Sequence, residues 1–132
     1  MNTTVYSHCG FSVPSIDTVS GNTCVPWLRS TTPTWPARDV AGSTNGDGVL
    51  LAVEISAATG AGTPTITIGY TNSAGTASRT ATNIIATVAS SAIGATYFIG
   101  LQAGDTGVRS VQSLTLSATW TSGTINLVAY RY

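Results

Sequence analysis

The chain of 132 residues is long enough for one domain with a single core, and its charged fraction of 8% lies far below the roughly 25% of an average soluble domain. Its five cations are all arginines, balanced by five carboxylates to a formal net charge of zero, so the basic stripe that nucleic-acid-binding proteins use to neutralise phosphates is missing and a nucleic-acid partner is not expected. A neutral surface lacks the repulsion that keeps solutes apart, which favours a place inside an assembly.

The first 47 residues are irregular and rich in proline and tryptophan. Proline at this density excludes helix interiors and central strands, so we expect an extended N-terminal arm over residues 1–47, with edge pairing near Thr4–Tyr6 and Gly10–Val13. Its tryptophans have two interpretations: they cover the open ends of the core, or they anchor the arm on a neighbouring subunit, as interface hot spots do. The residues that we predict as arm contacts are Trp27, Pro33, Trp35 and Pro36.

The arm also holds the only histidine, His8, and the only cysteines, Cys9 and Cys24. The opening residues lack the basic and apolar regions of a secretion signal, and no apolar run is long enough to span a bilayer, so we expect neither secretion nor a membrane partner. Two free thiols are therefore favoured over a disulfide. Because adjacent residues of an extended segment point to opposite sides, His8 and Cys9 form no catalytic pair, and we expect no metal and no cofactor.

Alternation of apolar and polar residues, typical of strands with one buried face, begins near residue 48. Ile66, Ile68 and Tyr70 are predicted to point inward between outward threonines. The longest segment is predicted to carry Thr80, Thr82, Ile84, Ala86 and Val88 on one face and Arg79, Asn83, Ile85 and Thr87 on the other, with a bulge or bend between Ile84 and Ile85. The expected strands are Val49–Ser56, Thr65–Thr71, Ser78–Val88, Gly94–Leu101, Val108–Trp120 and Thr124–Tyr132.

No segment shows helical spacing of apolar residues, so the predicted class is all-β. Six strong strands and one or two weak ones in the arm suit two packed antiparallel sheets over residues 48–132. A jelly roll is the first choice and an immunoglobulin-like sandwich the second. The cysteine and tryptophan spacing of antibody domains is not met.

Charged residues next to turns have structural interpretations. Asn45–Gly48 lacks the further carboxylates of a calcium loop and is predicted to be a connecting turn. Asp105 and Arg109 flank a turn, where we expect an Asx turn and an ion pair that pins the loop. Arg79 and Arg109 are predicted to be loop-pinning or interface cations. The carboxylates are scattered and no nucleophile lies beside a base, so we expect no enzyme activity.

Two strings in the C-terminal half carry a resemblance to a known family. They are IGYTNSAGTASRTAT at residues 68–82 and LQAGDTGVRSVQSLTLS at residues 101–117. Together they resemble virion structural proteins of tailed bacteriophages, over about residues 48–132. The resemblance implies a head decoration (cement) protein or another minor virion protein, with no catalytic residues to carry over.

A charge-poor β-domain with a proline- and tryptophan-rich arm suits a static role in a symmetric shell. The expected partners are the major capsid protein and further copies of this chain, and the expected location is the virion, assembled in the host cytoplasm. A tail or head–tail component, or a host-surface carbohydrate-binding module, remains open as an alternative, and an enzyme ranks last. The aromatic residues available for stacking on a sugar are Tyr97, Trp120, Tyr130 and Tyr132.

Overall fold

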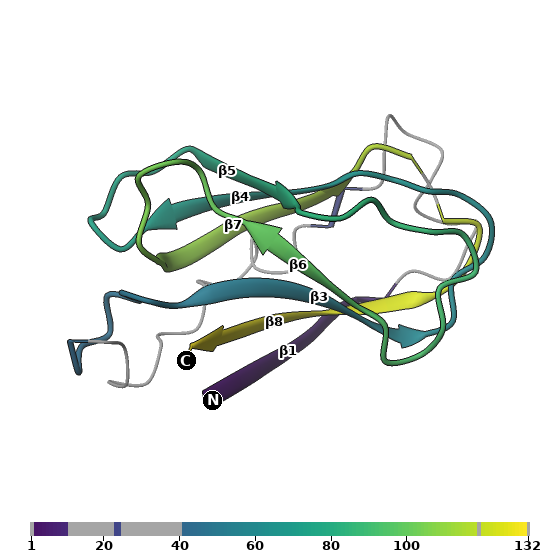
Figure 1. Cartoon of the computed structure of the whole chain (residues 1–132), viewed down its shortest axis with the longest axis horizontal. Helices are drawn as coiled ribbons and strands as arrows, with labels where there is room; N and C mark the ends of the chain where they lie inside the picture. The colour runs from purple at the N-terminus through teal and green to yellow at the C-terminus, as the bar shows by residue number, and fades with distance from the viewer. Residues whose placement is uncertain (1, 11–22, 25–40, 119, 132) are drawn as a thin grey trace.

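The computed structural model describes residues 2–10, 23–24, 41–118 and 120–131 (Figure 1). Within these ranges every regular element is a β-strand and none is a helix, which confirms the predicted all-β class. The strands pair antiparallel in one sheet with the order β1-β8-β3-β6-β5-β4-β7-β2. They are β1 (Asn2–Gly10), β2 (Thr23–Cys24), β3 (Leu50–Ala57), β4 (Ile66–Asn72), β5 (Arg79–Asn83), β6 (Thr96–Gly100), β7 (Val108–Leu116) and β8 (Thr124–Arg131).

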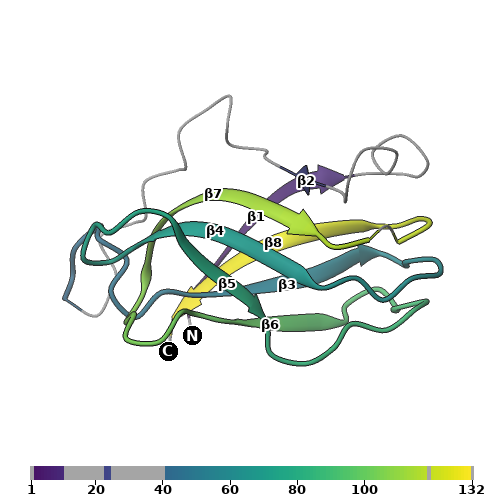
Figure 2. The ribbon, with the colours of Figure 1, turned by 90° about the horizontal axis from the view of Figure 1, so that it is seen from above.

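The sheet curls into a half-barrel. Figure 1 shows β5, β4 and β7 above β3, β8 and β1, with β6 crossing from one side to the other, and Figure 2 shows the same strands from above. The turn of the sheet falls where β5 and β6 pair through only two positions, Thr82 with Gly100 and Asn83 with Ile99. Since the pairing is continuous there, a division into two separate sheets is not confirmed.

The core fills the inside of this curl. Predicted inward residues of five strands are buried together, because alternate side chains of each strand face the same side. Burying each large aliphatic or aromatic side chain contributes roughly 1.5–3 kcal/mol. Those that match the prediction are Val49, Leu51, Val53, Ile55, Ile66, Ile68, Tyr70, Tyr97, Ile99, Leu114, Leu116, Trp120, Ile125, Leu127 and Ala129.

The predicted strand Ser78–Val88 is wrong in length. The strand ends at Asn83, and Ala81 is its buried residue, while Thr80 and Thr82 are exposed. A bend at Ile84 and Ile85 follows, at the predicted position. The residues that continue the alternation to position 88 lie in a loop. Outside a strand, alternation does not decide which side chains face inward.

Strands β3 and β8 are apolar on their outer face as well. Ala52, Val128 and Tyr130 form a second buried cluster there, with Leu50 packed against it. Strands covered on both faces have nearly continuous apolar sequence, as Leu50–Val53 and Ile125–Tyr130 do, apart from Asn126.

The described parts of residues 1–47 pair with the sheet at both ends of its strand order. Strand β1 pairs with β8, in agreement with the edge pairing predicted at Thr4–Tyr6, and β2 pairs with β7. Residues 11–13 of the second predicted pairing lie outside the described residues. The domain boundary at residue 48 and the redox state of Cys9 and Cys24 stay predictions.

Candidate functional site

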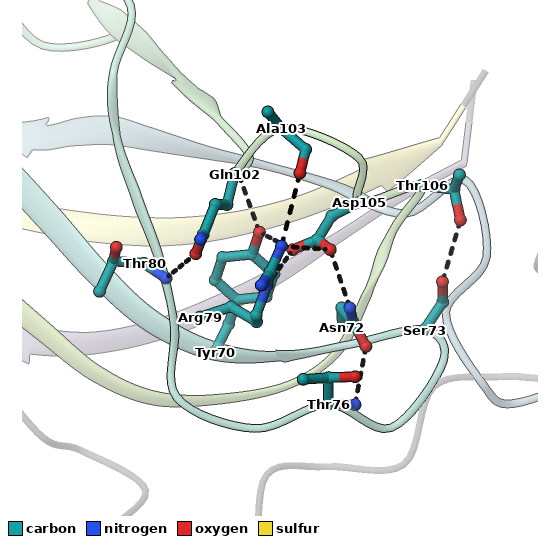
Figure 3. Close-up of polar contacts among 10 residues, drawn as sticks. All are labelled: Tyr70, Asn72, Ser73, Thr76, Arg79, Thr80, Gln102, Ala103, Asp105 and Thr106. Atoms are coloured by element: carbon teal, nitrogen blue, oxygen red, sulfur yellow. Dashed lines mark hydrogen bonds and ion pairs between the residues drawn. The ribbon is translucent and has the colours of Figure 1, made fainter.

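The most elaborate polar arrangement in the described chain surrounds Asp105, in the loop between β6 and β7 (Figure 3). Its carboxylate accepts a hydrogen bond from the Tyr70 hydroxyl at 2.5 Å and one from Nδ2 of Asn72 at 2.8 Å. The guanidinium of Arg79 donates to both carboxylate oxygens, from Nε at 2.9 Å and from an Nη atom at 3.0 Å. We name Tyr70, Asn72, Arg79, Gln102 and Asp105 the Asp105 cluster. It joins β4, β5 and the β6–β7 loop.

Local backbone geometry brings these side chains together. Asn72 closes the β4–β5 turn: its carbonyl accepts from the amide of Gly75 at 2.9 Å, and its Oδ1 accepts from the amide of Thr76 at 2.8 Å. Across from this turn, the amide of Gln102 donates to the Tyr70 hydroxyl at 2.9 Å. Each polar atom of the Tyr70 and Asn72 side chains therefore has a partner, as buried polar groups require.

The surroundings of Asp105 favour its charged form. Its side chain is 3% exposed and that of Arg79 is 23% exposed. The hydrogen bonds from Arg79, then Tyr70 and Asn72, lower the pKa of Asp105 from 3.8 to about 2. Burial, followed by the hydrogen bond to Asp105, raises the pKa of Tyr70 above its ordinary value. At neutral pH the cluster is an ion pair with a neutral phenol, which suits holding a loop.

Arg109 has a different partner from the predicted one. The expected ion pair between Asp105 and Arg109 is wrong, because Asp105 pairs with Arg79 across 26 positions of sequence. Arg109 donates instead to the carbonyl oxygen of Ser73 at 2.6 Å. Arg109 therefore secures the turn between β4 and β5, whereas Arg79 ties the start of β5 to the β6–β7 loop. The predicted Asx turn gives way to hydrogen bonds with more distant residues.

A second polar group secures the other end of the curl. The Ser91 hydroxyl lies 2.5 Å from the Tyr97 hydroxyl and donates to the carbonyl of Val88 at 2.8 Å, and the Ser91 amide donates to Oγ1 of Thr59 at 2.8 Å. The Thr87 hydroxyl donates to the carbonyl of Pro64 at 2.5 Å. We name Thr59, Thr87, Ser91 and Tyr97 the Ser91 cluster. It ties the β5–β6 loop to the β3–β4 loop.

The outer face of β4, β5 and β7 is hollowed. An open depression of about 490 Å³ is lined by backbone, hydroxyl and amide groups beside Gly69, where an added side chain would collide with the Ser113 hydroxyl. Its polar side chains are those of Thr71, Ser78, Thr80, Gln112 and Ser113. It carries no exposed aromatic ring, because Tyr70 points into the core.

The predicted arm contacts Trp27, Pro33, Trp35 and Pro36 lie outside the described residues. Of the proposed sugar-stacking aromatics, Tyr97, Trp120 and Tyr130 are buried, and Tyr132 is also outside the described residues. Sequence reasoning missed the polar partners in the Asp105 cluster. One signal was present: Asn72 continues the inward series of Ile68 and Tyr70 at the same period of two, so a buried amide could have been inferred.

Among the described residues, no three histidine, cysteine or acidic side chains come together in a group able to hold a metal ion. Nor does that part of the chain contain a helix long and apolar enough to cross a membrane. In comparisons with known proteins, no family model, curated protein or solved structure matches the chain.

Proposed function

We propose that the protein is a structural component of a tailed-bacteriophage virion, and specifically a head decoration (cement) protein. In this role it acts without catalysis, bound to the major capsid protein and to copies of itself. It adds buried area at junctions between capsid subunits and so opposes the pressure of packaged DNA, and a standard interface of roughly 1,600 Å² repeated over a shell suffices. We also propose that the curled sheet is arranged as a jelly roll.

One observation carries the proposal. The two strings that resemble phage virion proteins, residues 68–82 and 101–117, meet in space as the Asp105 cluster. Tyr70, Asn72 and Arg79 come from the first, and Gln102 and Asp105 from the second. Their distinctive residues are used to hold loops in one conformation, which supports a role that depends on shape.

The test uses heads assembled without this protein. Purified protein is mixed with such heads and imaged by electron cryomicroscopy. We expect saturable binding at one repeated position of the lattice. Binding at a single vertex would instead make it a head–tail component, and absence of binding to heads would contradict the proposal.

A host-surface carbohydrate-binding role is the second candidate, favoured by the hollow beside Gly69. Hydroxyl and amide groups such as those of Thr71 and Gln112 match the hydrogen-bonding needs of sugar hydroxyls. A glycan array separates the two roles. Binding to a glycan that Gln112→Ala abolishes, together with absent binding to heads, would favour this candidate.

A further inference from the structure

In the loop between β5 and β6, residues 84–95, two polar side chains are buried and aliphatic side chains are exposed, the reverse of the usual distribution. Thr87 and Ser91 are buried, whereas four aliphatic side chains face solvent. Ile84 is 67% exposed, Ile85 and Ile93 are each 71% exposed, and Val88 is 56% exposed. Single exposed aliphatics are ordinary, but four in a loop of twelve residues require a reason.

The loop is held in this arrangement by the Ser91 cluster. Its hydroxyl groups bond to Pro64 and Val88 carbonyls and to the Tyr97 hydroxyl, so turning the loop over would leave buried polar groups without partners. Ser90 also adopts a positive φ of 54°, which is unfavourable for a residue with a side chain. The exposed aliphatics are therefore displayed by a conformation that the fold enforces.

Strand β6 extends the apolar surface next to the start of this loop. The amide of Ile84 donates to the carbonyl of Phe98 at 2.9 Å, and the Phe98 side chain is 49% exposed. Its ring meets the Tyr130 ring edge-on, with centroids 5.8 Å apart. The loop patch, as we name Ile84, Ile85, Val88, Ile93 and Phe98, thus adjoins the outer-face cluster of Ala52, Val128 and Tyr130.

Charge and size indicate what covers the loop patch. No charged residue occurs between Arg79 and Asp105, so the loop patch itself contains no charge; Glu54, which pairs with Thr96, lies on the same sheet face as Phe98. The exposed fractions of the five residues add up to about three fully exposed residues, in the range of roughly 300–600 Å² at which the largest apolar patch of a monomer is often functional. Two such patches facing each other approach the roughly 1,000 Å² of total burial expected of a specific interface.

We propose that the loop patch is a homotypic interface, in which two copies of this chain pack these residues against each other about a two-fold axis. The contact is apolar, and the Ser91 cluster pre-orders it, so little loop entropy is lost on association. This inference does not depend on the virion role, because it concerns the association of the purified chain alone.

The test compares the unmodified chain with the double variant Ile85→Ser/Ile93→Ser by sedimentation equilibrium. Both side chains are mostly exposed, so the core is untouched. We expect the unmodified chain to dimerise with rising concentration, and the variant to do so about 100-fold more weakly, since each isoleucine loses apolar burial in both copies. The matched control is Ala74→Ser/Ala77→Ser, exposed in the β4–β5 connection, which should dimerise as the unmodified chain does.

A measurement without substitutions covers the case in which the variant fails to fold. Hydrogen exchange of the unmodified chain at low and high concentration should show added protection in residues 84–98. A chain that stays monomeric at every concentration would overturn the proposal, as would a dimer whose protection and affinity leave the loop patch unaffected. Protection of the loop patch by undecorated heads alone would reassign it to the shell protein and likewise overturn the homotypic contact.

Discussion

At the scale of single residues, Asp105 shows how one carboxylate can organise three segments. It is nearly inaccessible to solvent, yet it remains charged because four donated hydrogen bonds replace its water. Hydrogen bonds to a charged group are stronger than those between neutral groups, and leaving such a group unpaired is costly. The same residue therefore makes the fold sensitive to acid.

We expect the free energy of unfolding to fall as the pH drops from about 4 to about 2. The folded pKa of Asp105, about 2, lies below its ordinary value of 3.8, so in this interval the unfolded chain binds more protons than the folded chain. The stabilisation is complete above the ordinary pKa and is lost as the pH falls through the folded one. Urea unfolding at a series of pH values measures it.

Two variants test whether Asp105 causes this loss of stability in acid. Asp105→Asn should be less stable at neutral pH and should lose this part of the acid dependence. Tyr70→Phe removes a smaller contribution to the lowered pKa, so it should narrow the interval without abolishing it, and should cost roughly 1–3 kcal/mol for the partners left unpaired. An unchanged acid profile in Asp105→Asn would show that other groups cause the loss.

At the scale of elements, the strands are joined at both ends by loops that bond to one another. The β6–β7 loop, for instance, packs backbone to backbone against the segment before β3. The amide of Gly48 donates to the carbonyl of Thr106 at 2.8 Å, and Asp47 forms a bridge with Gly107. A side chain at residue 107 would collide with the carbonyl oxygen of Gly46. This close approach requires glycine.

We expect Gly107→Ala to lower the free energy of unfolding by about 3 kcal/mol or more, because a rigid backbone atom blocks the added methyl group. Gly104→Ala is the matched control in the same loop. Its φ of 89° disfavours alanine, but nothing lies within 4 Å of the added atom, so the cost should stay near 1–2 kcal/mol. Urea denaturation of both variants checks the order, and equal losses would contradict the close packing at residue 107.

At the scale of the whole molecule, charge is scarce, and among the described residues three charged side chains are used within the fold. Arg79 and Asp105 neutralise each other, and Arg109 bonds to a backbone carbonyl. The surface of the described part of the chain is rich in hydroxyls and small side chains, together with the aliphatics of the loop patch. Contacts of this kind depend on shape and on apolar burial more than on electrostatic attraction.

The proposed binding to capsids should accordingly resist salt. Raising the salt concentration from about 0.1 M to about 1 M, which shortens the screening length from roughly 10 to 3 Å, should weaken binding to undecorated heads less than about threefold. Co-sedimentation of the protein with heads measures this. A loss of tenfold or more would show that charged groups dominate the contact.

Local pattern predicted most of the strands and most of the core. Alternation with a period of two indicates directly which side chains share a face. The inward direction of Ile66, Ile68 and Tyr70 was therefore predicted correctly without any knowledge of the neighbouring strands. The same rule failed after Asn83, where the chain leaves the sheet and Thr87 and Ser91 turn inward. There the orientation depends on carbonyl and hydroxyl partners contributed by other loops.

The amino-acid order by itself determined the all-β class, the turns, and which faces of the long strands are apolar, because these follow from side-chain alternation and from the backbone preferences of glycine and asparagine. Only the tertiary structure decided that the sheet is continuous through β5 and β6, that Asp105 pairs with Arg79 and not Arg109, and that the isoleucines after β5 face solvent. These outcomes depend on which distant segments meet. That choice is made by the packing and hydrogen bonding of the whole chain.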